Sequence, residues 1–299
     1  TSGLVLSPKE FPHLTGLKGR TLLTSDGTTI LGADDKAGIA EILTMIERIQ
    51  TENRPHGTIC VAFTPDEEIG MGAEHFNLDQ FGAEYAYTLD GDSEGEIQYE
   101  NFNACKAEFE IRGFNVHPGE GKDTMINASL VAIEINNCLP SMETPRGTED
   151  YEGFYHLISM QGEVGEAKLN YIVRDHDKNG FEERKKTLRL IEKNLNAKWG
   201  EGTVTLKITD QYLNMKEIVE EHMHLIDHAK KACEAAGVAP LILPIRGGTD
   251  GCQLSFKGLP CPNLGTGGHA FHGPYEHISV EGMEKSVELL LALIQEYTK

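Results

Sequence analysis

Short apolar runs and helical patterns alternate along the first hundred residues. The run Ile-Cys-Val-Ala-Phe at 59–63 has the length and the β-forming side chains of a buried strand. Residues 30–31 close a shorter strand before it, and residues 85–89 form another after it. Between the first two strands the apolar side chains recur at helical spacing, as Ile39, Ile42, Leu43, Ile46 and Ile49. This alternation predicts an α/β domain with a mostly parallel sheet and helices on both faces.

The pattern changes near residue 100. The elements predicted after it are a strand at 105–112, a helix at 127–139, strands at 154–160 and 168–174, a helix at 181–195 and a strand at 204–208. The order β-α-β-β-α-β is that of a ferredoxin-like unit, with a four-stranded sheet and both helices on one face. After about residue 214 the α/β pattern returns. We therefore predict an α/β domain made of residues 1–103 and 214–299, interrupted by an α+β insert at 104–213.

Composition narrows the choice of partners. The 299 residues are 39% hydrophobic and carry a net charge of −20, which suits a globular chain and disfavours binding to nucleic acid or anionic membranes. No stretch is apolar for long enough to span a bilayer, and residues 1–15 lack the basic head and apolar core of a signal peptide. The six cysteines are scattered, without a Cys-x-x-Cys pair. We expect a cytoplasmic protein.

Acidic residues follow three of the predicted strands. The run at 59–63 leads into Asp66, Glu67 and Glu68, while Asp34 and Asp90 follow the other two strands. Taken alone, three acids in one loop are equally compatible with a solvated turn and with a metal-binding carboxylate beside a general base. The carboxyl ends of parallel strands meet at one edge of a sheet, where α/β proteins bind ligands. Three acidic strand ends therefore predict a metal site at that edge.

Five short motifs follow one another along the chain. They are Gly-Ala-Asp-Asp-Lys-Ala-Gly from residue 32, Thr-Pro-Asp-Glu-Glu-Ile-Gly from residue 64, Asn-Val-His-Pro-Gly from residue 115, Arg-Gly-Gly-Thr-Asp-Gly from residue 246, and the late pair His272-Gly273. As an ordered set they resemble the peptidase T family, the tripeptide aminopeptidases among the dinuclear zinc exopeptidases. Glutamate carboxypeptidases and succinyl-diaminopimelate desuccinylases are related to that family. The resemblance runs from about residue 6 to residue 294, and Tyr-Glu-Gly-Phe-Tyr-His at 151–156 is closer to peptidase T than to its relatives.

The resemblance implies an α/β zinc-exopeptidase fold and a set of metal ligands. Asp34 would bridge two zinc ions, and its peptide bond to Asp35 would be cis. Glu68 and His272 would complete one zinc site, while Asp90 would bind the other zinc ion. A bridging carboxylate suits this chemistry because it holds two cations close enough to share one hydroxide.

The resemblance also implies a general base and substrate contacts. Glu67 would take a proton from the zinc-activated water and pass it to the leaving amine. His117 would steady the oxyanion that forms on the peptide carbonyl. The other residues implied in substrate binding are Asn127, Arg174 and Arg246.

The chain departs from the family pattern before Asp34. The family carries a His-x-Asp motif well ahead of the Gly-Ala-Asp-Asp loop, and its histidine completes the zinc site shared with Asp90. Here 33 residues precede Asp34, and the one early histidine, His13, has no aspartate two places on. We interpret His13 as a surface residue and expect the family's amino-terminal portion to be absent. The expected consequences are at most one tightly held zinc ion, reduced peptidase activity, and an unpaired sheet edge or exposed apolar face.

Alternative functions stay open at this point. A zinc amidase or carboxypeptidase of the same fold would use the same metal site on N-acyl amino acids or dipeptides. An inactive remnant with an incomplete metal site would serve only for binding or dimerisation. The insert is expected to supply a homodimer contact, because the outer strands of its sheet must be covered or charged. His224 and His228 have the i, i+4 spacing of a metal pair, but no glutamate follows His224 as a metalloprotease helix requires.

Overall fold

The computed structural model describes residues 3–298, which form two compact units. Unit 2 consists of Asn101–Asn214 and Arg246–Gly248. Unit 1 contains the residues up to Glu100, Met215–Ile245 and the residues from Thr249 onward. The chain therefore builds part of an α/β unit, forms an α+β unit, and then returns to the first.

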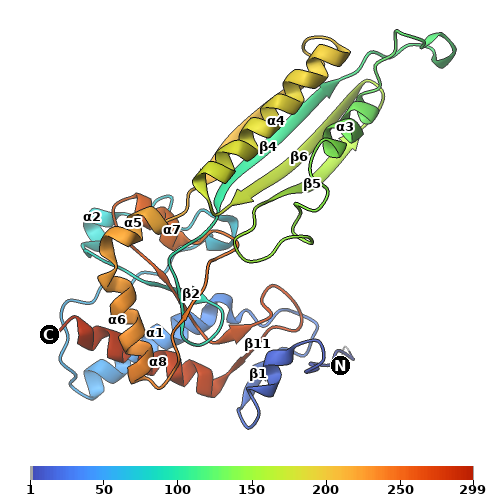
Figure 1. Cartoon of the computed structure of the whole chain (residues 1–299). Helices are drawn as coiled ribbons and strands as arrows, with labels where there is room; N and C mark the ends of the chain where they lie inside the picture. The colour runs from blue at the N-terminus through green and yellow to red at the C-terminus, as the bar shows by residue number, and fades with distance from the viewer. Residues whose placement is uncertain (1–2, 299) are drawn as a thin grey trace. The chain divides into compact units, whose positions relative to one another are not determined.

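Unit 2 is a four-stranded sheet with two helices on one face (Figure 1). Its elements are β4 (Asn103–Arg112), α3 (Ala128–Asn137), β5 (Phe154–Gly162), β6 (Glu166–Asp175), α4 (Lys178–Trp199) and β7 (Val204–Tyr212). The strand order is β5-β6-β4-β7, and every pairing is antiparallel. This arrangement confirms the β-α-β-β-α-β prediction, including its two helices on a shared face.

Side-chain alternation explains why the helices cover only one face of this sheet. Along β4, Ala107, Phe109 and Ile111 are buried in the core with α3 and α4, whereas Glu110 points outward and pairs with Lys168. Helix α4 begins after Asp177, whose carboxylate accepts a hydrogen bond from the Gly180 N–H (2.7 Å). Its buried side chains are Phe181, Leu188, Ile191 and Leu195. Each buried side chain of this size contributes about 1.5–3 kcal/mol to folding, so the apolar stripe of α4 is a main source of stability in this unit.

Unit 1 contains a mixed sheet and a small antiparallel sheet. The mixed sheet has the order β2-β9-β3-β8 and is formed by β2 (Thr88–Gly91), β9 (Asn263–Gly265), β3 (Glu96–Gln98) and β8 (Leu241–Ile242). The β2–β9 and β3–β8 pairings are parallel, and β3–β9 is antiparallel. In the second sheet, β11 (His277–Ser279) lies between β1 (Leu22–Thr24) and β10 (Gly268–His269). The α/β class predicted for this unit is confirmed, but its sheets are mixed and antiparallel, and not mostly parallel as predicted.

Three long helices accompany these sheets. Helices α1 (Ala33–Thr51) and α6 (His224–Ala235) both pack against α8 (Val280–Glu296), whose leucines are buried. The shorter helices are α2 (Leu78–Phe81), α5 (Lys216–Val219) and α7 (Asp250–Phe256), with 3₁₀ turns η1 (Pro12–Thr15), η2 (Glu67–Ile69), η3 (Pro118–Glu120) and η4 (Glu220–His222). Helix α1 begins within the first acidic motif, and η2 lies within the second.

Several predicted elements of unit 1 differ from the structure. Residues 59–63 form no strand, because no segment of residues 3–298 pairs with them. Ile59, Val61 and Phe63 are consequently 36%, 38% and 50% exposed. The first strand lies at Leu22–Thr24 and not at 30–31. A strand needs a neighbour to satisfy its N–H and C=O groups, and an apolar run alone does not supply one.

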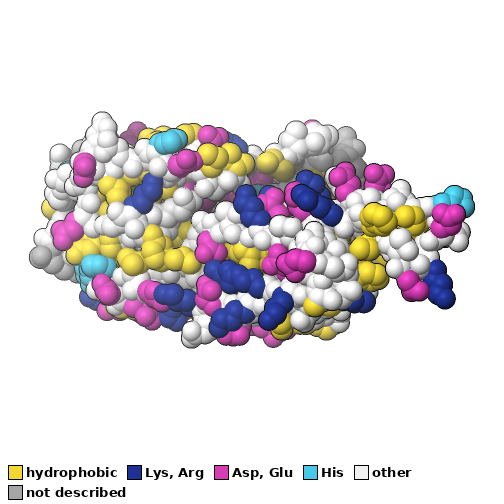
Figure 2. Space-filling model, turned by 90° about the horizontal axis from the view of Figure 1, so that it is seen from above, with side chains coloured by type: hydrophobic (Ala, Val, Ile, Leu, Met, Phe, Trp, Pro, Cys, Tyr) yellow, Lys and Arg dark blue, Asp and Glu magenta, His cyan; other side chains and the backbone are white. Residues whose placement is uncertain are grey.

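Charge is spread widely over the molecule. On the face shown in Figure 2, acidic and basic side chains alternate, with apolar side chains between them. Among residues 3–298, no helix has the length and apolar character needed to cross a membrane.

Candidate metal centre

The first acidic motif is placed by the start of helix α1. Asp34 and Asp35 lie in the first turn of α1 but have non-helical backbone angles, and the peptide bond between them is cis, as predicted. The Asp35 carboxylate accepts a hydrogen bond from the Gly38 N–H (3.2 Å). A Cβ atom at Gly38 would lie 2.3 Å from the Leu89 carbonyl and 2.6 Å from Asp35 Oδ1, so only glycine fits there. The Lys36 ammonium donates a hydrogen bond to the Leu31 carbonyl (3.2 Å).

The second acidic motif is a tight turn held by helix α7. Asp66 and Gly70 both have left-handed backbone angles and enclose η2, which contains Glu67 and Glu68. The Ala73 N–H donates to Asp250 Oδ1 (3.1 Å), and the Asp250 N–H donates to the Glu67 carboxylate. Asp250 therefore contacts the acidic turn from both its backbone and its side chain.

Further contacts fasten the same turn. The Gln253 amide donates to the Gly70 carbonyl (2.9 Å), and the Lys257 ammonium donates to the Glu74 carbonyl (2.8 Å). Both side chains come from α7 or the residue that caps it. A Cβ atom at Gly72 would lie 2.2 Å from Asp250 Oδ2. The glycine is thus required where the acidic turn approaches α7 most closely.

Three of the predicted metal ligands converge. His272 Nε2 lies 2.9 Å from Asp34 Oδ2 and 3.1 Å from Glu68 Oε2. One ligand atom from each of the three residues lies within 4.8 Å of the others, and among residues 3–298 this is the one such group of three or more. Two carboxylate oxygens and an imidazole nitrogen are donors that zinc accepts, and three protein ligands are usual for a catalytic zinc ion. These side chains therefore fit the metal that the sequence implies.

Asp90 lies beside this group, at the end of β2. Its carboxyl group shares a hydrogen bond with that of Asp34. The pKa of Asp90 is raised to about 9; burial is the largest cause, and the charges of Asp35, Glu67 and Asp34 contribute to the same shift. Burial likewise raises the pKa of Asp35 to about 8. A bound cation would offset the repulsion among these carboxyl groups and stabilise their ionised form.

Glu67 also has a perturbed pKa. Burial is the largest cause, the charges of Asp250, Glu68 and Asp34 add to it, and the pKa rises to about 7. For His272, burial lowers the pKa, but the carboxylates of Glu68 and Asp34 outweigh that effect and leave it raised. A carboxylate with a pKa near neutrality suits a general base. The structure thus gathers Asp34, Glu67, Glu68, Asp90 and His272 in one part of unit 1.

The residues expected to bind substrate from the insert lie in unit 2. His117 is exposed and accepts a hydrogen bond from the Gly119 N–H at Nδ1 (3.2 Å). Asn127 caps helix α3 by accepting from the Leu130 N–H (3.3 Å). Arg174 is buried, donates to the Val173 carbonyl (3.0 Å), and its guanidinium lies over the Tyr212 ring.

Arg246 also belongs to unit 2. Its guanidinium donates to the carbonyls of Asp150 (2.7 Å) and Glu152 (3.1 Å) and to the Thr148 hydroxyl (2.9 Å). The same group lies over the rings of Phe102 and Phe154. Arg246 therefore orders the loop that contains the Tyr-Glu-Gly-Phe-Tyr-His sequence.

His13 lies in a group of histidines with His269 and His277. His13 Nε2 is 2.9 Å from His277 Nε2, and its ring stacks on that of His269. The His277 Nδ1 contacts the Tyr275 carbonyl (2.7 Å) and is therefore the protonated nitrogen, so the His13 N–H donates to His277 Nε2. These contacts attach η1 to the β10–β11 hairpin, and His13 remains exposed as predicted.

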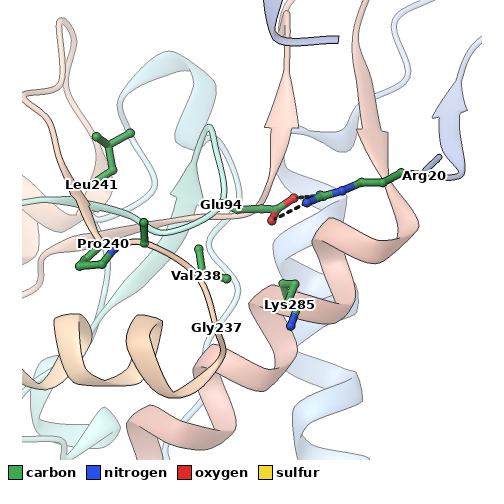
Figure 3. A pocket seen from close by; sticks show the side chains of 8 residues that line it. Arg20, Glu94, Gly237, Val238, Pro240, Leu241 and Lys285 are labelled. Carbon is green, nitrogen blue, oxygen red and sulfur yellow. Dashed lines mark hydrogen bonds and ion pairs between the residues drawn. The ribbon is translucent and has the colours of Figure 1, made fainter. Parts of the chain in front are cut away.

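Unit 1 also has a surface hollow of about 440 Å³ that contains none of the predicted site residues. Figure 3 shows the Arg20–Glu94 ion pair on one side of it and Lys285 on the other. Arg20 also donates to the Ser279 hydroxyl (3.2 Å), and Lys285 donates to the Ala236 carbonyl (2.9 Å). The charged groups of this hollow thus already bond within the protein.

Comparison with known proteins identifies the family of the chain. The model of Peptidase family M20/M25/M40 matches residues 27–296. The chain belongs to this peptidase family. It is 54% identical over 298 residues to a Peptidase T from Halothermothrix orenii, and the match covers 99% of the chain and 73% of the relative.

Solved structures of family members have the same fold as this peptidase. An aminopeptidase PepT from Bacillus cereus ATCC 10987 matches with a TM-score of 0.81 at 28% identity, over 93% of this chain and 74% of its own. A tripeptidase from Staphylococcus aureus matches with a TM-score of 0.82 at 24% identity over the same shares, which shows a common fold. The sequence-based assignment to this family is confirmed.

Proposed function

We propose that this peptidase is a metal-dependent aminopeptidase that releases the N-terminal residue from tripeptides. The observation that supports it most directly is the convergence of Asp34, Glu68 and His272 beside Glu67. The identity of 54% with a Peptidase T favours an aminopeptidase over an amidase or a carboxypeptidase of the same fold. The six cysteines are all free, which supports a reducing compartment such as the cytoplasm.

In this proposal Asp34, Glu68 and His272 hold a zinc ion, with one imidazole nitrogen and two carboxylate oxygens. A zinc ion held there would supply a Lewis acid for a water molecule and for the peptide carbonyl. Glu67 takes the water proton and delivers it to the leaving amine, for which its pKa of about 7 is well placed. A second zinc ion would have only Asp34 and Asp90 among the described side chains. With its three protein ligands, the group of Asp34, Glu68 and His272 should hold one zinc ion tightly.

The test combines metal analysis with a substrate panel. After dialysis against zinc, the purified chain should hold about one zinc ion, and His272→Ala should hold none. The exposed His75, which lies outside the site, supplies the control variant His75→Ala. Tripeptides should be cleaved at their first bond faster than dipeptides or N-acyl amino acids, and only by the zinc-loaded chain. Preferred cleavage of N-acyl amino acids would contradict the proposal, as would equal zinc binding by His272→Ala.

We also propose that unit 2 supplies a homodimer contact. Strand β5 is an edge of its sheet, and its side chains Ile158 and Met160 are 55% and 40% exposed. An exposed apolar edge strand is suited to pairing with another chain. Sedimentation should show a dimer at micromolar concentration, and Ile158→Lys should shift it to monomer. Sedimentation of the unaltered chain as a monomer would contradict this part of the proposal.

A further inference from the structure

Glu276 is a buried carboxylate in the loop between β10 and β11. Its side chain is 2% exposed, and it accepts hydrogen bonds from the N–H groups of Gly32 (2.5 Å, at Oε2) and Asp34 (3.1 Å, at Oε1). Burying a carboxylate costs several kcal/mol unless its oxygens are bonded. Two charge-assisted bonds, one to each oxygen, offset that cost.

The position of these two N–H groups explains why they favour an acid. They lie at the start of helix α1, where N–H groups have no partner within the helix. Gly32 occupies the N-cap position in a left-handed conformation (φ 69°) and has no side chain with which to cap the helix. Glu276 supplies from another segment the oxygens that an Asp or Ser would supply locally. The helix dipole adds a favourable interaction with its negative charge.

Glu276 also lies four residues after His272, in the same hairpin loop. Its two hydrogen bonds connect that loop to the segment that contains Asp34. The same two segments also meet at their expected metal ligands, where His272 Nε2 lies 2.9 Å from Asp34 Oδ2. One buried side chain thus joins two of the three stretches of chain that contribute ligands to the centre, although Asp34 and His272 are 238 residues apart.

We propose that Glu276 is a positioning residue of the metal centre, which holds Asp34 against His272 through the backbone of the Gly-Ala-Asp-Asp loop. The inference rests on the proposed function, because it takes Asp34 and His272 as ligands of a single ion. Groups that orient metal ligands by hydrogen bonding typically affect metal affinity by about 10- to 100-fold. A residue that only capped helix α1 would change the unfolding temperature and leave the metal affinity unchanged.

A matched control lies in the same unit. Glu281 also accepts a hydrogen bond from a distant backbone N–H, that of Thr21 (2.8 Å), but it bonds to no segment with a predicted metal ligand. The variants to compare are Glu276→Gln, Glu276→Ala and Glu281→Gln. The Glu276→Gln substitution keeps the shape of the side chain and one acceptor oxygen, so this variant should fold even if Glu276→Ala does not. Circular dichroism and thermal unfolding establish that each variant is folded at the temperature of the assay.

Zinc titration by calorimetry is the first measurement. We expect Glu276→Gln to weaken zinc binding by about tenfold and Glu276→Ala by up to about a hundredfold, with Glu281→Gln unchanged. A folded Glu276→Gln variant that binds zinc as tightly as the unaltered chain would overturn the proposal.

A second measurement does not depend on zinc. In metal-free crystal structures, the contact between Asp34 Oδ2 and His272 Nε2 should be present in the unaltered chain and lost in Glu276→Ala, or in Glu276→Gln if the alanine variant does not fold. Retention of that contact in the variant would overturn the role of Glu276. If the unaltered chain binds no zinc, the proposed metal function fails, and the crystal structures still decide whether Glu276 sets this geometry.

Discussion

Zinc binding by this peptidase should release protons, and its affinity should therefore rise steeply with pH. In the metal-free site, burial raises the pKa of Asp90 to about 9 and that of Asp35 to about 8. His272 also has a raised pKa, because Glu68 and Asp34 outweigh the effect of its burial. A histidine binds zinc through its neutral imidazole ring, and a divalent cation lowers the pKa of nearby carboxyl groups. The protons held by the empty site near neutral pH must leave when zinc enters.

The size of the effect follows from the number of protons. Each proton released makes the affinity change tenfold per pH unit, or about 1.4 kcal/mol. His272 and Asp90 are the groups nearest to the expected ion that hold a proton, so we expect between one and two protons to leave at about pH 6.5. Between about pH 6 and pH 7 the affinity should thus rise about 10- to 100-fold.

Calorimetry in buffers of different ionisation enthalpy measures this proton release directly. The titration should be repeated at several pH values, with the zinc affinity corrected for binding by the buffer. The variant Asp90→Asn removes one titrating carboxyl group and should reduce the number of protons released. An affinity that stays constant between about pH 6 and pH 8, with no buffer dependence of the measured heat, would refute the reasoning.

Three further outcomes are expected. Burial raises the pKa of Glu41 to about 10, so the folded chain retains a proton that the unfolded chain loses, and the free energy of unfolding should fall as pH rises from about 4 to 10. In urea unfolding at about pH 8, the Glu41→Gln variant should be more stable than the unaltered chain by roughly 2 to 4 kcal/mol, and an equal or lower stability would contradict this. Gly72→Ala would place a Cβ atom 2.2 Å from Asp250 Oδ2 and should lower the zinc affinity, and it should also lower the free energy of unfolding by about 1–3 kcal/mol in thermal unfolding. Gly57→Ala is the neutral control, because no atom lies within 4 Å of a Cβ atom there. Arg246→Ala removes a guanidinium bonded to two carbonyls and a hydroxyl and should cost about 2–3 kcal/mol in urea unfolding; a smaller loss accompanied by a large rise in KM for tripeptides would indicate substrate binding instead.

Local sequence patterns determined the secondary structure of the insert and the position of the acidic motifs. The alternation in β4 and the apolar stripe of α4 predict the insert because each helix or strand buries one face, and that face is visible in a short stretch of sequence. The motifs around Asp34, Glu68 and His272 imply a set of ligands through their resemblance to a known family, and the residue types are ones that bind metal. The cis bond between Asp34 and Asp35 was implied by resemblance and is present.

Other features were decided only by tertiary contacts. Residues 59–63 have the composition of a strand but form none, because ladder hydrogen bonds depend on a neighbour that no local pattern specifies. The pKa values of Glu67 and Asp90 arise from burial and from charges brought close by folding. Asp250 lies in a recognised motif, yet its contact with Ala73 joins residues 177 apart. No local pattern around Glu276 indicates its role. Its partner Asp34, at the start of helix α1, lies 242 residues earlier in the chain, and only folding brings the two together.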